Sequence, residues 1–177
     1  MNIVTLKDKK FKLYINENNI IIKINEVAEK INNDFKDKEL VIICVLKGSF
    51  MFFSDLIKKI NVKCTIDFIR LSSYEKTKST GKIKNLMNTE IDVKDKHILI
   101  VEDIIDTGHT INYLINYFTS LEAKSLNIAT LFFKKNAYQY TKNPDYVAMF
   151  IPNKFIVGYG LDYDQYGRNL TDIYELI

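Results

Sequence analysis

Residues His97 to Thr110, HILIVEDIIDTGHT, decide how this chain is expected to fold. The stretch opens with an apolar run rich in branched side chains, continues through two acids, Glu102 and Asp103, and reaches a turn at Gly108. Apolar side chains then recur at helical spacing, at Ile111, Leu114, Ile115 and Phe118. The pattern predicts a buried strand, a loop that carries carboxylates, and a helix that begins on that loop.

The turn after the two acids has the composition of a phosphate site. A small turn at Gly108 exposes consecutive backbone N–H groups, and a helix start leaves its first N–H groups unpaired, with partial positive charge. Thr107 and Thr110 add hydroxyl donors, so the loop suits a phosphate. Glu102 and Asp103 would repel a bare phosphate, but they suit sugar hydroxyls, or Mg²⁺ that bridges to a diphosphate. By themselves these residues also fit a plain strand end followed by a polar turn.

The segment Val101–Gly108, with Thr110, resembles the phosphoribosyl-pyrophosphate signature of type I phosphoribosyltransferases. Its Glu-Asp pair, two isoleucines and Asp-Thr-Gly are similar to the hypoxanthine-guanine branch of that family. The resemblance implies that ribose and phosphate groups bind to Glu102, Asp103, Asp106, Thr107, Gly108, His109 and Thr110. It also implies that Asp106 is catalytic, because the family places this acid near N7 of the purine, where it exchanges a proton.

Composition limits the class of protein. The chain has 177 residues, 47% apolar and 27% charged, which fits one soluble globular domain. The net charge of +3 is mild, and no dense basic cluster interleaved with aromatic residues is present, so we expect no nucleic-acid partner. The longest apolar run, Leu40–Leu46, is too short to span a membrane, and the N-terminus lacks the apolar core of a secretory signal. Two cysteines without metal-ligand spacing favour a reducing, cytoplasmic location without a disulfide.

Along the chain, strand and helix patterns alternate as in α/β proteins. Helices are predicted at Asn18–Phe35, where apolar residues occupy one face, and at Phe50–Ile60. Strands are predicted at Leu40–Leu46, Thr65–Leu71, Ser125–Phe133 and Phe155–Gly160, with a possible edge strand within residues 1–17 and a returning arm at Ile83–Asn88. Asn143–Pro152 is interpreted as a connection between Ser125–Phe133 and the last strand.

The strand Leu40–Leu46 is followed by Lys47-Gly48-Ser49, at the strand end where open α/β sheets bind ligands. A plain strand-to-helix turn is the alternative reading of these residues. The resemblance implies instead that Lys47 and Gly48 belong to a pyrophosphate loop with a cis Leu46–Lys47 peptide. It further implies that Arg168 binds the pyrophosphate, although a surface salt bridge would also account for this arginine.

Residues 72–84 contain few apolar side chains and suit a mobile loop. In the resembled family a flexible lid closes over the reacting centre through a Ser-Tyr pair, which here corresponds to Ser73 and Tyr74. Closure excludes water that would hydrolyse a ribosyl cation. An ordinary solvent-exposed loop is the alternative.

Lys134 ends the strand Ser125–Phe133, where a charge is unusual unless it is paired or faces a ligand. A lysine can bond the carbonyl of a 6-oxopurine, and the family uses one here for that purpose; Lys135, next in the chain, is the competing candidate. The resemblance also implies that Phe155 stacks on the purine, the Ile156 backbone bonds its edge, and Asp162 holds a water-coordinated Mg²⁺. The family pattern is lost at Asn136–Tyr138, which puts the subunit contacts of that segment in doubt.

Together these features indicate an α/β protein with a doubly wound, mainly parallel sheet, and the resemblance implies a small hood formed from the termini. We expect one domain over residues 1–177, with a core at about 36–150, a hood from about 1–17 and 151–177, and a lid at about 72–84. The implied activity joins hypoxanthine, and guanine as well, to phosphoribosyl pyrophosphate, with Mg²⁺ held by Glu102, Asp103 and Asp162. The alternatives are a non-catalytic regulator that senses phosphoribosyl pyrophosphate and a transferase that prefers xanthine. By analogy the assembly is a homodimer or homotetramer.

Overall fold

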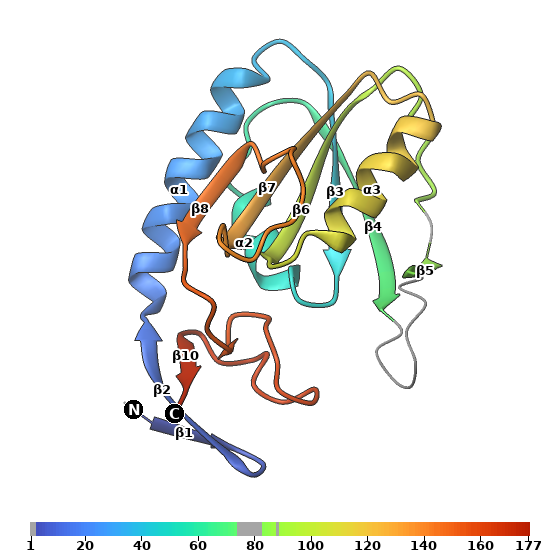
Figure 1. Cartoon of the computed structure of the whole chain (residues 1–177). Helices are drawn as coiled ribbons and strands as arrows, with labels where there is room; N and C mark the ends of the chain where they lie inside the picture. The colour runs from blue at the N-terminus through green and yellow to red at the C-terminus, as the bar shows by residue number, and fades with distance from the viewer. Residues whose placement is uncertain (1–2, 74–82, 88) are drawn as a thin grey trace.

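In the computed structural model, residues 3–73, 83–87 and 89–177 are described. A six-stranded sheet with the order β5-β4-β3-β6-β7-β8 forms the centre of the molecule (Figure 1). Its strands are β3 (Leu40–Leu46), β4 (Cys64–Ser73), β5 (Ile83–Met87), β6 (His97–Ile105), β7 (Ser125–Phe133) and β8 (Tyr146–Phe150). All neighbouring pairs are parallel except β4 with β5, which are antiparallel. The predicted α/β class and mainly parallel sheet are therefore confirmed.

Strand β3 shows why this sheet is covered on both faces. Its residues alternate between two separate apolar clusters, because successive side chains of a strand point to opposite faces. Ile42 and Cys44 belong to the cluster beneath helices α1 (Glu17–Asp34) and α2 (Phe50–Ile57). Val41 and Ile43 belong to the cluster beneath helix α3 (His109–Ser120). Burial on both faces explains the uninterrupted apolar sequence of the strand.

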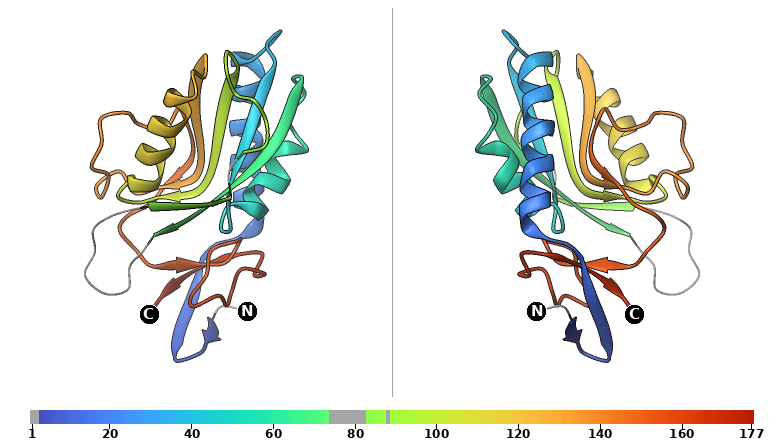
Figure 2. Two further views of the ribbon diagram at one scale, coloured as in Figure 1. Left: turned by 90° about the vertical axis from the view of Figure 1, so that its right-hand side faces the viewer. Right: turned by 90° about the vertical axis from the view of Figure 1, so that its left-hand side faces the viewer.

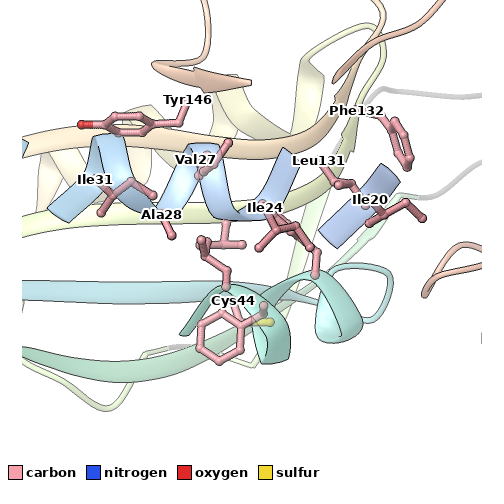
Figure 3. Close-up of a cluster of buried hydrophobic side chains, with 14 of the residues drawn as sticks. Ile20, Ile24, Val27, Ala28, Ile31, Cys44, Leu131, Phe132 and Tyr146 are labelled. Carbon is pink, nitrogen blue, oxygen red and sulfur yellow. The ribbon is translucent and has the colours of Figure 1, made fainter. Parts of the chain in front are cut away.

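Helix α1 begins where the sequence provides a cap and buries one face. Asn16 accepts a hydrogen bond from the backbone N–H of Asn19 at 3.0 Å, which satisfies one of the unpaired donors of the first turn. The buried side chains follow a helical period and pack toward β3, β7 and β8 (Figure 3). They are Ile20, Ile24, Val27, Ala28 and Ile31. Complete burial of one such isoleucine contributes about 1.5–3 kcal/mol.

A second, antiparallel sheet lies beyond the carboxyl ends of the parallel strands (Figures 1 and 2). Its order is β1-β2-β10-β9, from β1 (Ile3–Leu6), β2 (Lys9–Ile15), β10 (Ile173–Leu176) and β9 (Ile156–Val157). Both ends of the chain thus build it, as expected for the hood. The expectation of an edge strand near the N-terminus was wrong for β2, because β10 pairs with its second side.

Several boundaries differ from the sequence-based expectation. Helix α2 ends at Ile57 rather than Ile60, since the backbone N–H groups of Lys59 and Ile60 bond to carbonyls three residues back, in tight turns. The segment interpreted as a connection contains β8, which runs parallel to β7 and places Tyr146 against α1. Strand β9 covers only Ile156–Val157, because the chain then turns through Gly158, at φ +103°.

Candidate active site

The ends of β3 and β6 meet the C-terminal part of the hood around an open pocket of about 220 Å³. Its lining includes candidate residues from segments far apart in the sequence. They are Lys47 and Gly48 after β3, Glu102 and Asp103 on β6, Thr110 on α3, and Asp162 and Arg168 from the hood. A smaller pocket of about 100 Å³ shares Glu102 and Thr110 and is lined by the loop from Ile104 to Ile111. The structure therefore brings together the residues that the sequence analysis assigned to the ribose, the diphosphate and the phosphate.

A larger pocket, of about 710 Å³, lies elsewhere. It is lined by residues between 32 and 39 and by residues 61–63, at the C-terminal end of α1 and the start of β3 and β4. Parallel strands begin at that end of the sheet, whereas ligands of open α/β sheets bind beyond the carboxyl ends. Two of its charged residues, Lys63 and Glu39, form an ion pair with each other at 3.3 Å. We therefore place the active site at the smaller pockets.

Of the adjacent acids of β6, Asp103 is buried and Glu102 is partly buried. Asp103 is 7% exposed, and its Oδ1 accepts a hydrogen bond from the backbone N–H of Ile104 at 2.8 Å. Oε2 of Glu102 is buried and has no hydrogen-bond partner among the described residues. Burial, together with the charge of Asp103, raises the pKa of Glu102 well above its usual value. Burial also raises the pKa of Asp103, although the backbone N–H of Ile104 opposes that shift.

The loop after β3 approaches these acids so closely that only glycine fits. A Cβ atom on Gly48 would lie 1.5 Å from Oδ2 of Asp103. From the other side, a Cβ atom on Gly160 would lie 2.0 Å from the carbonyl oxygen of Gly48. The peptide between Leu46 and Lys47 is cis, as the family resemblance implied. Gly48 thus lies directly between Asp103 of β6 and Gly160 of the hood.

Arg168 links the hood to the same pocket. One guanidinium nitrogen lies 2.5 Å from Oδ1 of Asp162, and the other donates to the carbonyl of Gly160 at 2.8 Å. The second carboxylate oxygen of Asp162 accepts from the backbone N–H of Gln165 at 2.7 Å. The side chain of Gln165 in turn accepts from Nζ of Lys47 at 3.3 Å. Arg168 therefore forms an ion pair, as its alternative interpretation required, and this pair lines the pocket; its binding of pyrophosphate stays a prediction.

The two lysines at the end of β7 are clearly different. Lys134 is 8% exposed, and its Nζ lies 2.7 Å from Oδ2 of Asp106. It also lies 3.4 Å from the side-chain oxygen of Asn153, while Lys135 is exposed. A buried ammonium needs a charged or polar partner, and Lys134 has one in the predicted catalytic acid. The pairing joins the end of β7 to the loop after β6.

The loop from Asp106 to Thr110 has the predicted form of a helix N-terminus. Gly108 precedes α3 with φ +88°, a left-handed conformation that glycine adopts without strain. Its carbonyl accepts the first helical hydrogen bond, from the backbone N–H of Asn112 at 2.9 Å. The first residues of α3, whose N–H groups have no partner within the helix, line the small pocket together with Thr107.

The predicted purine-binding side chains lie in the hood. Phe155 is 47% exposed, and its ring centre lies 6.2 Å from that of Phe11 and 6.1 Å from that of Tyr163. Nζ of Lys9 lies 5.8 Å from the Phe155 ring centre. Ile156 is in β9, which is an edge strand of the small sheet, so one side of this strand has no neighbouring strand in the sheet. Of the predicted lid pair, Tyr74 lies outside the described residues, and Ser73 is described only by its backbone pairing with Ile83.

A divalent cation would find oxygen ligands here but no complete protein cage. Among residues 3–73, 83–87 and 89–177, no three His, Cys, Asp or Glu side chains gather closely enough to hold a metal. Mg²⁺ is commonly bound by one or two carboxylates while substrate oxygens and water complete its shell. The unpartnered Oε2 of Glu102 fits that mode of binding.

Sequence reasoning missed the residues that join the hood to the core. The hydroxyl of Tyr159 donates to Asp55 on α2, and Gly160 lies on the backbone of Gly48. Within the core, Tyr138 and Tyr140 contact the loop at Gly108, and sequence reasoning missed these residues as well. These contacts connect segments distant in sequence, so no local pattern predicts which residues meet. The Gly-Tyr-Gly run at 158–160 could have indicated only that the backbone turns or is closely approached there.

The chain is similar to known phosphoribosyltransferases over most of its length. The family model of the phosphoribosyl transferase domain matches residues 13–164. A hypoxanthine-guanine phosphoribosyltransferase of Streptococcus pyogenes is 42% identical over 160 residues, 90% of this chain and 89% of its own. The same-named protein of Aquifex aeolicus is 36% identical, over 96% of each chain. A crystal structure of a hypoxanthine-guanine phosphoribosyltransferase from Bacillus anthracis superposes with a TM-score of 0.88 at 40% identity, over 94% of this chain and 96% of that one.

Proposed function

This chain belongs to the phosphoribosyltransferase family, and on that premise we propose how its residues carry out the reaction. The chain is a purine salvage transferase that converts hypoxanthine and phosphoribosyl pyrophosphate to IMP and pyrophosphate. Guanine gives GMP in the same way. In this reaction the bond from ribose C1 to the diphosphate breaks, a bond from C1 to purine N9 forms, and the purine loses a proton. The ribose gains cationic character while the leaving group gains negative charge.

Glu102 and Asp103 of β6 are proposed to stabilise the positive charge that develops on the ribose. We assign Glu102 and Asp103 to the two ribose hydroxyls, since both carboxylates line the pocket and Oε2 of Glu102 has an unused acceptor position. Carboxylates held beside a developing cation stabilise it most where water is excluded. Because Asp103 lies against Gly48, the ribose would be held directly beside the diphosphate loop.

The diphosphate is assigned to the loop at Lys47 and Gly48, with Arg168 opposite. Backbone N–H groups and two cationic side chains can neutralise the negative charge that develops as the leaving group departs. Arg168 is held by its ion pair with Asp162, and both side chains line the pocket, so its guanidinium would need little rearrangement to meet the diphosphate. Orientation before binding reduces the entropy lost in the transition state.

Mg²⁺ is the proposed cofactor, on Glu102, Asp103 and Asp162 with the substrate's own oxygens. Bound there, the ion would supply Lewis-acid stabilisation of the diphosphate. The donors are all carboxylate oxygens, the type that Mg²⁺ prefers. Asp162 is shared with Arg168, so we expect it to act through water rather than by direct ligation.

The contact between Lys134 and Asp106 is the observation that carries the assignment at the purine. It places a buried ammonium, a donor for the purine carbonyl, 2.7 Å from the acid assigned to N7. When a 6-oxopurine enters, Lys134 would donate to its O6, and Asp106 would accept the N7 proton as N9 attacks C1. Phe155 would stack on the base and the Ile156 backbone would bond its edge.

The 5′-phosphate is assigned to Thr107, Gly108, His109 and Thr110, at the start of α3. Anchoring a group remote from the reacting bond positions C1 for attack. Ser73 and Tyr74 are proposed to close over the centre and exclude water. The alternative of a regulator has no observation in its favour.

The proposed setting is the cytoplasm. None of the described helices is long and apolar enough to cross a membrane. Both cysteines are free, and burial raises the pKa of the Cys44 thiol to about 12, so that thiol stays protonated and unreactive. Substrates are small molecules, and we propose a homodimer or homotetramer, which light scattering coupled to size-exclusion chromatography would measure.

A steady-state assay tests the function. Phosphoribosyl pyrophosphate, Mg²⁺ and each of hypoxanthine, guanine, xanthine and adenine are supplied in turn. We expect nucleotide formation from hypoxanthine and guanine, lost when Mg²⁺ is chelated. Fastest turnover of xanthine would assign the xanthine-preferring alternative. No product from any base, with phosphoribosyl pyrophosphate still bound, would favour the regulator.

A further inference from the structure

The segment after β7 covers the phosphate-binding loop with two tyrosines that have no role in the assignments above. A Cβ atom on Gly108 would lie 2.2 Å from Cε2 of Tyr138 and 3.0 Å from Cδ2 of Tyr140. The backbone N–H of Gln139, between them, donates to the carbonyl of Thr107 at 3.2 Å. Residues 138–140 therefore hold the loop by side-chain packing and by a backbone hydrogen bond.

This segment is itself fixed to the core. The ring of Tyr138 packs edge-to-face on Phe133 of β7, with ring centres 5.2 Å apart. Its hydroxyl donates to the carbonyl of Lys142, and the backbone N–H of Ala137 donates to the carbonyl of Lys134 at 2.9 Å. Tyr140 is then placed by its ring contact with Tyr138, at 6.0 Å between centres.

Tyr140 reaches one side chain of the phosphate loop. Its hydroxyl lies 2.7 Å from Nδ1 of His109, the first residue of α3. The two rings meet at an interplanar angle of 84°, with centres 5.7 Å apart. A hydrogen bond and an edge-to-face contact together restrict both torsions of the imidazole. His109 lines the small pocket, so the ring is held where the 5′-phosphate is assigned.

We propose that Tyr140 is a positioning residue for the 5′-phosphate, acting through His109. A neutral imidazole has one donor and one acceptor nitrogen, and a phenol is an effective donor. When Tyr140 donates to Nδ1, the ring proton resides on Nε2, and Nε2–H becomes the group that can bond a phosphate oxygen. The inference rests on the proposed function and deepens it, by naming the residue that sets the orientation and tautomer of one phosphate ligand.

The tautomer can be observed without turnover. The chain contains two histidines, His97 and His109, so a long-range ¹H–¹⁵N spectrum of the imidazoles has two sets of signals, and His97→Gln assigns them. We expect His109 in the Nε2–H form, a shift of its Nε2 signal on adding ribose 5-phosphate, and a mixture of tautomers in Tyr140→Phe. An Nδ1–H form in the unmodified protein, or an unchanged spectrum in Tyr140→Phe, would overturn the proposal.

Kinetics distinguish positioning from a purely structural role. In Tyr140→Phe we expect KM for phosphoribosyl pyrophosphate to rise about fivefold, the effect of one neutral hydrogen bond, with kcat and KM for hypoxanthine within about twofold. Tyr113→Phe, which removes a hydroxyl one turn further along α3, should leave all three values unchanged. His109→Gln combined with Tyr140→Phe should be no worse than His109→Gln alone.

Additive losses in the double variant, or equal changes in all three kinetic values, would contradict the proposal. If the proposed function itself is wrong, the experiments give a different result from the one that contradicts the role of Tyr140. The unmodified protein would then form no nucleotide from any base, while the imidazole spectrum would still report whether Tyr140 sets the tautomer and whether ribose 5-phosphate reaches His109.

Discussion

Lys134 and Lys135 are neighbours in sequence with opposite environments. One is buried and paired with Asp106, and the other is exposed. Lys134→Gln keeps a donor for the purine carbonyl but loses the charge, so kcat/KM for hypoxanthine should fall about 10- to 100-fold, as expected for one charge-assisted hydrogen bond. Lys135→Gln is the matched control and should change kcat/KM for hypoxanthine by less than about twofold. Equal losses in the two variants would remove Lys134 from the site.

Asp106 can be tested with an isosteric change. Asparagine still accepts a hydrogen bond from Lys134 but cannot take the N7 proton. Asp106→Asn should therefore lower kcat by about 10²- to 10⁴-fold, the usual contribution of a positioned acid or base, with a modest change in the Kd of phosphoribosyl pyrophosphate. Single-turnover kinetics and calorimetric binding measure the two effects separately. Undiminished turnover would exclude Asp106 from the mechanism.

Single residues were predictable where a motif placed them at the end of a strand. The pattern around β6 indicated the carboxylates and the phosphate turn, and the choice of Lys134 over Lys135 followed from the family alignment. Tyr140, Gln165 and Tyr159 could not be found in that way, because their partners are distant in sequence. Which hydroxyl meets which side chain is decided by tertiary packing, which a local pattern does not encode.

Among the elements, buried strands were predicted best. Leu40–Leu46 and Ser125–Phe133 match β3 and β7 to the residue. Burial on both faces gives β3 an unbroken apolar run, and β7 is apolar along most of its length. Strand β8 was missed since it is short, lies between Pro144 and Pro152, and takes its pairing from β7. The N-terminal strand was taken as an edge because its partner β10 lies at the opposite end of the chain.

Strand β4 carries an acid that anchors the chain after β5. The carboxylate of Asp67 accepts hydrogen bonds from the Thr89 hydroxyl and from the backbone N–H groups of Phe68, Glu90 and Ile91. Burial alone would raise the pKa of Asp67, but these hydrogen bonds outweigh it and lower the pKa below the usual 3.8. The ionised form is therefore the one that the folded state stabilises.

The consequence is a pH-dependent stability. The contribution of Asp67 is present above its unfolded-state pKa and is lost as the pH falls through the lower folded-state pKa. Asp67→Asn should cost about 1–2 kcal/mol of unfolding free energy at about pH 7, and the difference should shrink below about pH 4. Urea unfolding at several pH values measures it. Asp37→Asn, at an exposed site with φ +61°, is the control; a pH-independent difference for Asp67→Asn would contradict the assignment.

At the scale of the whole molecule, the site is divided between two sheets. The core supplies Glu102, Asp103 and Thr110 to the larger of the two pockets at the candidate site, while the hood supplies Asp162 and Arg168. Their relative position must therefore be fixed for the pocket to form. The close approach of Gly160 to Gly48 provides one such connection, and the hydrogen bond from Tyr159 to Asp55 on α2 provides another.

Tyr159 can test whether contacts between the hood and the core shape the pocket, because it belongs to the hood and is buried against the core. Its side chain is 1% exposed, and hydrogen bonding to Asp55 adds to the effect of burial in raising the pKa of the phenol. Tyr159→Phe keeps the ring and removes the bond, leaving Asp55 with one partner fewer. We expect a loss of about 1–2 kcal/mol, or about 2–8 °C in Tm.

The kinetic signature follows from the position of Tyr159 beside Gly160, whose carbonyl holds Arg168 at 2.8 Å. Tyr159→Phe should raise KM for pyrophosphate in the reverse reaction by about three- to tenfold, and leave KM for hypoxanthine within about twofold. Tyr174→Phe is the control within the hood, since its hydroxyl makes a longer bond of 3.4 Å to Asp172. If Tyr159→Phe lowered Tm without any change in KM for pyrophosphate, Tyr159 would stabilise the fold without positioning Arg168.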